Sequence, residues 1–196
     1  MTAGRAATWA ALLAVVVLAA LAGCRDKRAR VEPPATESIA RGKTTVGQLK
    51  KGLLEALTRA MATGVPAAIA ACNIEAPALA AALAVDGVVV GRATHKPRNP
   101  KNRAAGWTVE ALTRFETMRR DGRDLAGASY ARRLPDGRTA YAEPLVIQEL
   151  CLACHGAQLA PEVTAALTER YPGDEATGYQ VGDLRGVVWV ELPPRL

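Results

Sequence analysis

Two cysteines and one histidine lie together in the short segment 151–155, as Cys151, Cys154 and His155. This Cys-X-X-Cys-His spacing is typical of the covalent attachment of a c-type haem. The two thiols can add across the vinyl groups of the haem, and the adjacent imidazole is then held at the iron as its proximal axial ligand. The segment therefore predicts one covalently bound haem c, with Cys151 and Cys154 as thioether donors and His155 as an iron ligand.

The same side chains suit two other chemistries. Together with Cys72 they form a nominal Cys3His zinc set, and a Cys-X-X-Cys pair can form a redox-active disulfide. The zinc set is disfavoured because Cys154 and His155 are adjacent, whereas closed zinc sites usually separate their paired ligands by intervening residues. The disulfide is disfavoured because no regular βαβ pattern surrounds the pair. Covalent haem attachment explains the segment best.

The N-terminus carries an export signal, as the attachment of a c-type haem outside the cytoplasm requires. Arg5 precedes an apolar stretch over residues 6–20, and the sequence Leu-Ala-Gly-Cys at 21–24 follows as a bacterial lipobox. Cleavage there removes residues 1–23 as a lipoprotein signal peptide and leaves Cys24 as the lipidated N-terminus. An uncleaved membrane helix is the alternative, since the stretch approaches the lower limit of about 17 residues for a span. We expect an envelope lipoprotein, anchored to a membrane through Cys24 and facing the periplasm.

The remainder of the chain is long enough for one domain of ordinary size. Residues 24–36 are charged and contain consecutive prolines, which predicts an extended tether, and residues 37–196 then form the domain. The formal net charge is +6, but basic and acidic residues are interspersed, so no nucleic-acid partner is expected. A solvated surface close to anionic headgroups explains the basic excess.

Periodicity predicts the elements that must position this site. Helices are expected where apolar residues recur at helical spacing, over residues 37–64, 76–85, 109–119 and 161–170. Strands are expected where β-branched residues gather, over residues 88–94 and 186–192, and in a hairpin formed by 128–134 and 138–147 around Pro-Asp-Gly. The two kinds of element mix without regular βαβ alternation. We therefore predict an α+β fold, an antiparallel sheet with flanking helices.

Several spaced motifs together resemble the PAS-like c-type haem domains, a family catalogued as a domain of unknown function. The motifs are the apolar run ending at Cys72, Arg98-Asn99-Pro100, Trp107 with the helix through Phe115, Tyr141 with Pro144, the Cys-X-X-Cys-His segment and the glycine-containing stretch 171–186. The resemblance implies a PAS-like fold around one haem, with Cys72 and His155 as axial iron ligands. It also implies either a small exported protein or the sensor part of a membrane signalling protein. The sequence departs from the family pattern at 103–108, where acidic residues are expected around the tryptophan.

The residues alone leave the role of Cys72 open. It ends the apolar run 67–72, where a cysteine is commonly an inert buried side chain. His95, the other of the two histidines, lies in a polar stretch typical of an exposed loop and is a poor ligand candidate. The other three of the four cysteines already have predicted roles, which agrees with the ligand role that the resemblance implies for Cys72.

Arg92 and Arg98 are candidate partners for the haem propionates, because a guanidinium matches a carboxylate in geometry and charge. Salt bridges within the protein explain the two arginines equally well. The sequence does not separate these interpretations.

Three functions follow from a haem with two protein ligands. No open iron position remains for a substrate, so a sensor that responds to redox state or to a gas such as nitric oxide or carbon monoxide is favoured over an enzyme. Cys72 is the ligand expected to give way. Electron transfer between envelope proteins is the alternative, and a peroxidase-like enzyme is the weaker one. A redox or signalling protein partner is expected in the first two cases.

Overall fold

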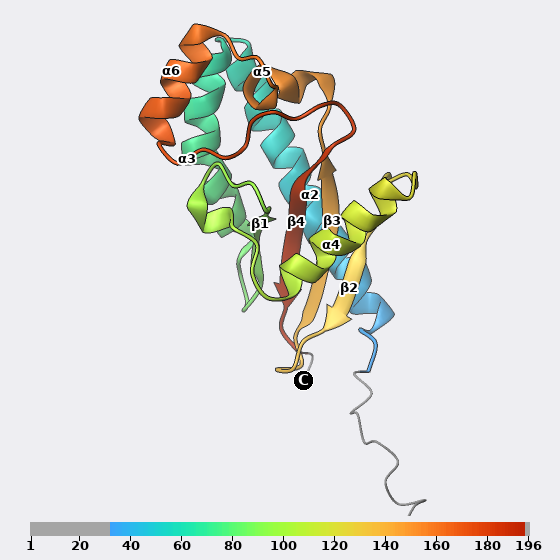
Figure 1. Ribbon diagram of the computed structural model, residues 1–196. Helices are drawn as coiled ribbons and strands as arrows, with labels where there is room; N and C mark the ends of the chain where they lie inside the picture. The colour runs from blue at the N-terminus through green and yellow to red at the C-terminus, as the bar shows by residue number, and fades with distance from the viewer. Residues whose placement is uncertain (1–31, 195–196) are drawn as a thin grey trace, which may run out of the picture. The chain divides into compact units, whose positions relative to one another are not determined.

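The computed structural model describes residues 32–194 of the chain (Figure 1), so the predicted signal peptide and Cys24 lie outside the described residues. The elements in chain order are α2 (Thr36–Met61), α3 (Val65–Leu83), β1 (Val89–Ala93), η1 (Pro100–Asn102), α4 (Trp107–Arg120), β2 (Tyr130–Arg133), β3 (Thr139–Val146), η2 (Glu149–Cys151), α5 (Leu152–His155), α6 (Pro161–Arg170) and β4 (Leu184–Leu192). The predicted α+β class is confirmed, and α6 has the bounds that the sequence predicted.

The strands form a four-stranded antiparallel sheet in the order β1-β4-β3-β2. The C-terminal strand β4 is internal, and its Val190 lies opposite Val90 of β1 and Tyr141 of β3. The predicted hairpin joins β2 and β3, where the Leu134 N–H donates to the Arg138 carbonyl at 2.8 Å. The β2–β3 hairpin is therefore a local pairing, whereas β4 completes the sheet by long-range pairing with β1 and β3.

Helices cover both faces of this sheet (Figure 1). On one face, Val46 and Leu49 of α2 are buried with Val188 and Val190 of β4. On the other face, Phe115 of α4 is fully buried in a second cluster that includes Val187, the β4 residue before Val188. Because side chains alternate along a strand, β4 supplies apolar residues to both layers.

Glycine lets α2 approach the sheet closely. A Cβ atom built on Gly42 would lie 2.8 Å from the Cβ of Tyr141 on β3. Real Cβ atoms do not come that close, so a larger residue would push the helix away. This contact positions the α2 side chains that continue toward the end of the sheet.

Residues 65–83 form one helix, whereas the sequence predicted an apolar run at 67–72 and a separate helix over 76–85. Pro77 lies inside this helix, α3, where it removes one backbone hydrogen bond. Its side chain is exposed, so the proline ring lies on the solvent side of the helix. The helix ends earlier than predicted, because Asp86 and Gly87 turn the chain into β1 with φ values of 51° and 74°.

Among the described residues, α3 is the helix long and apolar enough, by length and composition, to cross a membrane. In this fold its Ile69 is buried against Val163 and Leu167 of α6. Its buried face therefore contributes to the core of the domain and carries Cys72 to the site described next.

Candidate functional site

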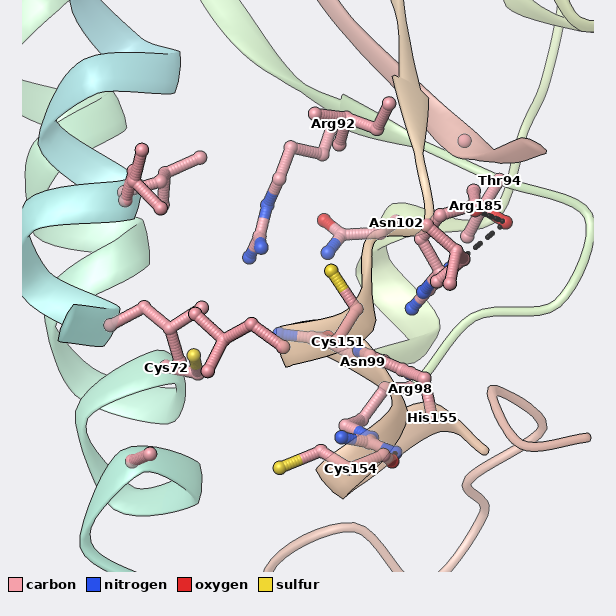
Figure 2. A pocket seen from close by; sticks show the side chains of 18 of the residues that line it. Cys72, Arg92, Thr94, Arg98, Asn99, Asn102, Cys151, Cys154, His155 and Arg185 are labelled. Carbon is pink, nitrogen blue, oxygen red and sulfur yellow. Dashed lines mark hydrogen bonds between the residues drawn. The ribbon is translucent and has the colours of Figure 1, made fainter. Parts of the chain in front are cut away.

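A cavity of about 270 Å³ lies between α2, α3, the end of the sheet and the segment 149–155 (Figure 2). Much of its wall is aliphatic, formed by residues such as Leu53, Leu57, Met61, Ile69 and Leu145. Every predicted site residue within the described part of the chain lines it: Cys72, Arg92, Arg98, Cys151, Cys154 and His155. The fold thus brings together residues that the sequence separates widely.

The Cys-X-X-Cys-His segment is a tight bend made of η2 and the short helix α5. Residues three apart in such a turn share one face, so both Cys151 and Cys154 reach the cavity. Gly156 ends the bend, since a Cβ atom there would lie 2.7 Å from the Leu152 carbonyl oxygen. Both cysteines, like Cys72, are free thiols.

The backbone holds the neutral His155 ring in one tautomer. Its Nδ1 lies 2.6 Å from the carbonyl oxygen of Ala176, and a carbonyl can only accept a hydrogen bond. Burial, with the nearby charges of Arg98 and Arg185, lowers the pKa of His155 to about 3, so the ring is neutral. Nδ1 therefore donates and Nε2 keeps its lone pair. This is the arrangement that orients metal-ligating histidines.

Cys72 reaches the cavity from α3, across from the wall that carries Cys151 and His155 (Figure 2). Burial raises the pKa of this thiol, although the charges of Arg92 and Arg98 act in the opposite direction. A thiol in a cationic setting can become a thiolate ligand when a metal offers it a further positive charge.

The alternative zinc set is not assembled. Within residues 32–194, no group of three or more His, Cys, Asp or Glu side chains is arranged to hold a metal ion. These side chains therefore do not converge as the four ligands of a closed tetrahedral zinc site must.

The two candidate arginines have different surroundings. Arg98 pairs with Asp174 at 3.0 Å and also donates to the carbonyl oxygen of Cys154, and the side chains of the ion pair are only 11% and 10% exposed. Arg92 extends from β1 into the cavity (Figure 2), and burial lowers the pKa of its guanidinium. Within the described chain this guanidinium has no hydrogen-bond or ion-pair partner. Arg92 is therefore available to a bound anion, whereas Arg98 is already occupied by contacts within the protein.

Sequence reasoning gave no role to several residues of this site. Arg185 lines the cavity and donates to the Thr94 hydroxyl at 3.1 Å, and Tyr171 lines it as a buried aromatic. Asp174 and Ala176 hold Arg98 and His155. The only signal for these residues is their position in the glycine-containing stretch 171–186 of the family resemblance. The excluded candidate, His95, is 42% exposed and lies 3.8 Å from Glu116, as its polar surroundings predicted.

The fold and the site define a PAS-like α+β domain with a cavity lined by thiols, an imidazole and arginines. The sequence matches the Tll0287-like family over residues 12–193, and the chain belongs to this family. This confirms the resemblance to PAS-like haem domains.

One solved structure shares the fold across nearly its whole length. It is the crystal structure of the cyanobacterial heme-protein Tll0287, with a TM-score of 0.62 and 22% sequence identity, over 83% of this chain and 98% of that chain. At this identity the likeness concerns the fold. No curated protein matches the sequence.

Proposed function

We propose that this chain is an exported, lipid-anchored protein that holds one haem c in the cavity and responds to redox state or to a small gas. One observation carries the proposal: two thiols and an imidazole with the spacing for covalent attachment face the same cavity as the Cys72 thiol. The chain belongs to the Tll0287-like family, and the solved structure that shares its fold is that of the cyanobacterial heme-protein Tll0287, which supports the proposal.

The cavity residues fit the requirements of a haem one by one. Cys151 and Cys154 would form the thioether bonds, and Nε2 of His155 and Sγ of Cys72 would bind the iron. The aliphatic wall suits the macrocycle, and the buried Arg92 guanidinium suits a propionate. Arg98 is a weaker candidate for that contact because Asp174 already pairs with it. When bound, the haem supplies an iron centre whose oxidation state and ligands can change.

Cys72 is the residue through which a response would reach the fold. It lies on α3, which also carries Ile69 into the α6 cluster and Leu79 against the core of the sheet. A change in the bonding of Cys72 would therefore bias the packing of α3 between two arrangements. With both axial positions supplied by the protein, we propose no enzymatic turnover.

Electron transfer is the second candidate, favoured by the open side of the cavity. Leu54 and Leu150 line this side and are 58% and 43% exposed. A redox partner that docks there would approach the cofactor closely. Rapid reduction and reoxidation without ligand change would favour this function, whereas spectra that respond to carbon monoxide or nitric oxide would favour sensing.

Lipid anchoring is proposed from the sequence of residues 1–24 alone. The lipobox places a diacylglycerol-modified Cys24 at the mature N-terminus, in the envelope and facing the periplasm. Intact-mass analysis of the membrane-extracted protein tests this. A chain that begins at Met1 would contradict it.

The haem proposal is tested by the absorption spectrum of the protein purified after export. We expect a Soret band that stays with the polypeptide after acid-acetone extraction, because thioether bonds survive this treatment. A band that leaves with the solvent, or no Soret band after expression with the haem-attachment machinery, would contradict covalent attachment.

A further inference from the structure

The histidine of the attachment segment depends on partners outside its own helix. α5 has four residues, none of them buried, so the helix cannot fix the orientation of His155 by itself. The segment after α6 supplies the missing contacts: the Tyr179 N–H donates to the His155 carbonyl and the Gly178 N–H to the Gly156 carbonyl, both at 3.0 Å. The end of α5 is therefore held by residues 174–179.

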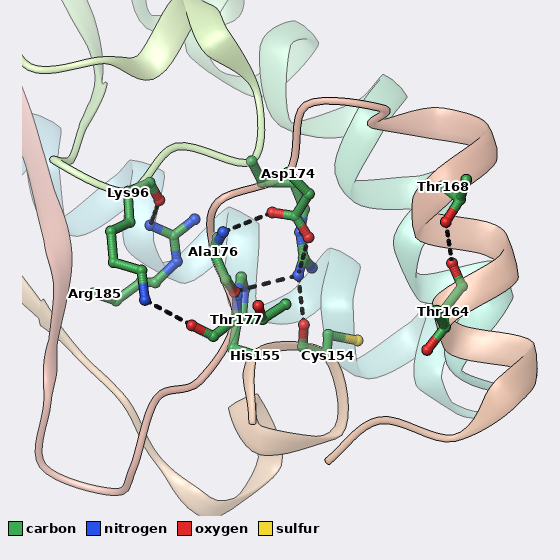
Figure 3. Close-up of polar contacts among 10 residues, drawn as sticks. Lys96, Cys154, His155, Thr164, Thr168, Asp174, Ala176, Thr177 and Arg185 are labelled. Atoms are coloured by element: carbon green, nitrogen blue, oxygen red, sulfur yellow. Dashed lines mark hydrogen bonds and ion pairs between the residues drawn. The ribbon is translucent and has the colours of Figure 1, made fainter. Parts of the chain in front are cut away.

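The Asp174 carboxylate links the segment after α6 to Arg98 and, through Arg98, to α5 (Figure 3). Asp174 Oδ1 accepts the Ala176 N–H at 2.8 Å, while its Oδ2 accepts Nε of Arg98 at 3.1 Å. Arg98 in turn donates to the Cys154 carbonyl. The Asp174 carboxylate thus holds Ala176, which accepts from Nδ1 of His155, directly. It holds Cys154, which precedes His155, through Arg98.

The hydrogen bonds that Asp174 makes with Ala176 and Arg98 are shielded from water. Ala176 is fully buried and the Asp174 side chain is 10% exposed, so water competes little for these hydrogen bonds. The neighbouring Glu175 differs, because its side chain is 46% exposed and pairs with Arg103 at the surface. Two adjacent carboxylates therefore have different settings, one at the site and one outside it.

We propose that Asp174 is a positioning residue of the haem site, which together with Arg98 fixes the Ala176 carbonyl against Nδ1 of His155. It thereby sets the tautomer and the ring orientation of the axial ligand. The inference rests on the proposed function, in which His155 binds iron. A partner that accepts from Nδ1 makes the ligand more basic, which stabilises the ferric state.

The test measures the reduction potential and the ferric electron paramagnetic resonance (EPR) spectrum of full-length holoprotein variants. Asp174→Ala should raise the potential and broaden the low-spin signal, because the ring loses its fixed acceptor. Asp174→Asn should raise the potential less, and Asp174→Glu should return it toward the wild-type value. Glu175→Ala is the matched control and should behave as wild type. An unchanged potential and signal in Asp174→Ala, or in Asp174→Asn if the alanine variant does not fold, would overturn the proposal.

Failure of the proposed function has a separate signature. If the wild-type chain carries no covalent haem, nitrogen-15 spectra of the histidine-labelled chain still test Asp174, since there are only two histidines and His95→Gln assigns them. We expect a single Nδ1–H tautomer for His155 in the wild type and a mixture in Asp174→Ala. The same tautomer in both would overturn the positioning role independently of haem.

Discussion

The sheet face that α4 covers and the cavity at the end of the sheet are built from different side chains. On the α4 face, Trp107 stacks on Tyr130 with ring centres 6.3 Å apart and meets Trp189 edge-on at 5.9 Å. The indole N–H of Trp107 donates to Glu191 at 2.7 Å, so even its polar atom is satisfied. We call this part, with Phe115 and the α2 face, the packed region.

At the cavity end, leucines, thiols and a cation line one cavity. Leu54 is 58% exposed, and the half-buried Arg92 points into the cavity among Cys72 and Cys151. Buried charges are costly unless they are paired, so a fold keeps such a residue when a ligand needs it. The packed region therefore supports the domain, whereas the cavity end offers side chains to a bound group.

The largest expected effect is at the attachment segment. Replacing both Cys151 and Cys154 by alanine should abolish covalent haem entirely, because no thioether bond can form. The measurement is the Soret absorbance that remains with the chain after acid-acetone extraction. Cys72→Ala is the control and should retain covalent haem, since Cys72 is proposed to bind the iron alone. Equal loss in the control would contradict the division of roles among the thiols.

In the packed region, Phe115→Ala should lower the free energy of unfolding by about 3–5 kcal/mol, because it leaves a cavity in a fully buried cluster. Urea unfolding of the haem-free chain measures this. Leu54→Ala at the open side of the cavity should cost about 0.5 kcal/mol or less in the absence of haem. If Leu54→Ala costs as much as Phe115→Ala, the two regions do not differ in packing.

The two arginines offer a sharper contrast within the cavity end. Arg98→Ala should destabilise the fold by about 3 kcal/mol, because it leaves the nearly buried Asp174 carboxylate unpaired. Arg92→Ala should change the free energy of unfolding much less, and should instead shift the reduction potential by removing a buried charge beside the cofactor. Denaturation and redox titration of both variants check this. The reverse order of stabilities would make Arg92 the structural arginine.

The smallest expected effect is a pH dependence in the packed region. Burial and the hydrogen bond to Glu143 raise the pKa of Tyr141 to about 12, from an ordinary value of 10. The unfolded chain therefore releases this proton first, and the stabilisation, complete below pH 10, is lost as the pH rises toward 12. Urea unfolding between pH 9 and pH 11 should show a steeper loss in the wild type than in Tyr141→Phe. If the free energy of unfolding falls equally with pH in both proteins, Tyr141 does not contribute to the pH dependence.

The sequence predicted those features that depend on local spacing. The 161–170 helix, the hairpin around Pro-Asp-Gly and the attachment segment all follow from periodicity or from adjacent residues. Cys72 was placed at the site through the family resemblance, and the cavity does include it.

What the sequence could not predict depends on distant contacts. Arg98 meets Asp174 across 76 positions, and no local pattern indicates that this arginine is already paired. The continuity of α3 through Pro77 was also missed, because a proline normally ends a helix unless the rest of the fold compensates for the lost hydrogen bond. The exposure of Pro77 and the packing of α3 on α2 and α6 compensate for that loss, and neither can be read from the local sequence.

We propose that Cys72 and His155 both bind the iron of one haem that Cys151 and Cys154 attach covalently. The most direct measurement compares the ferric EPR spectra of the wild-type holoprotein and Cys72→Ala. We predict a low-spin thiolate-ligated signal in the wild type that is lost or replaced in the variant, while the haem remains attached to Cys151 and Cys154. Identical spectra from the two proteins would contradict the account.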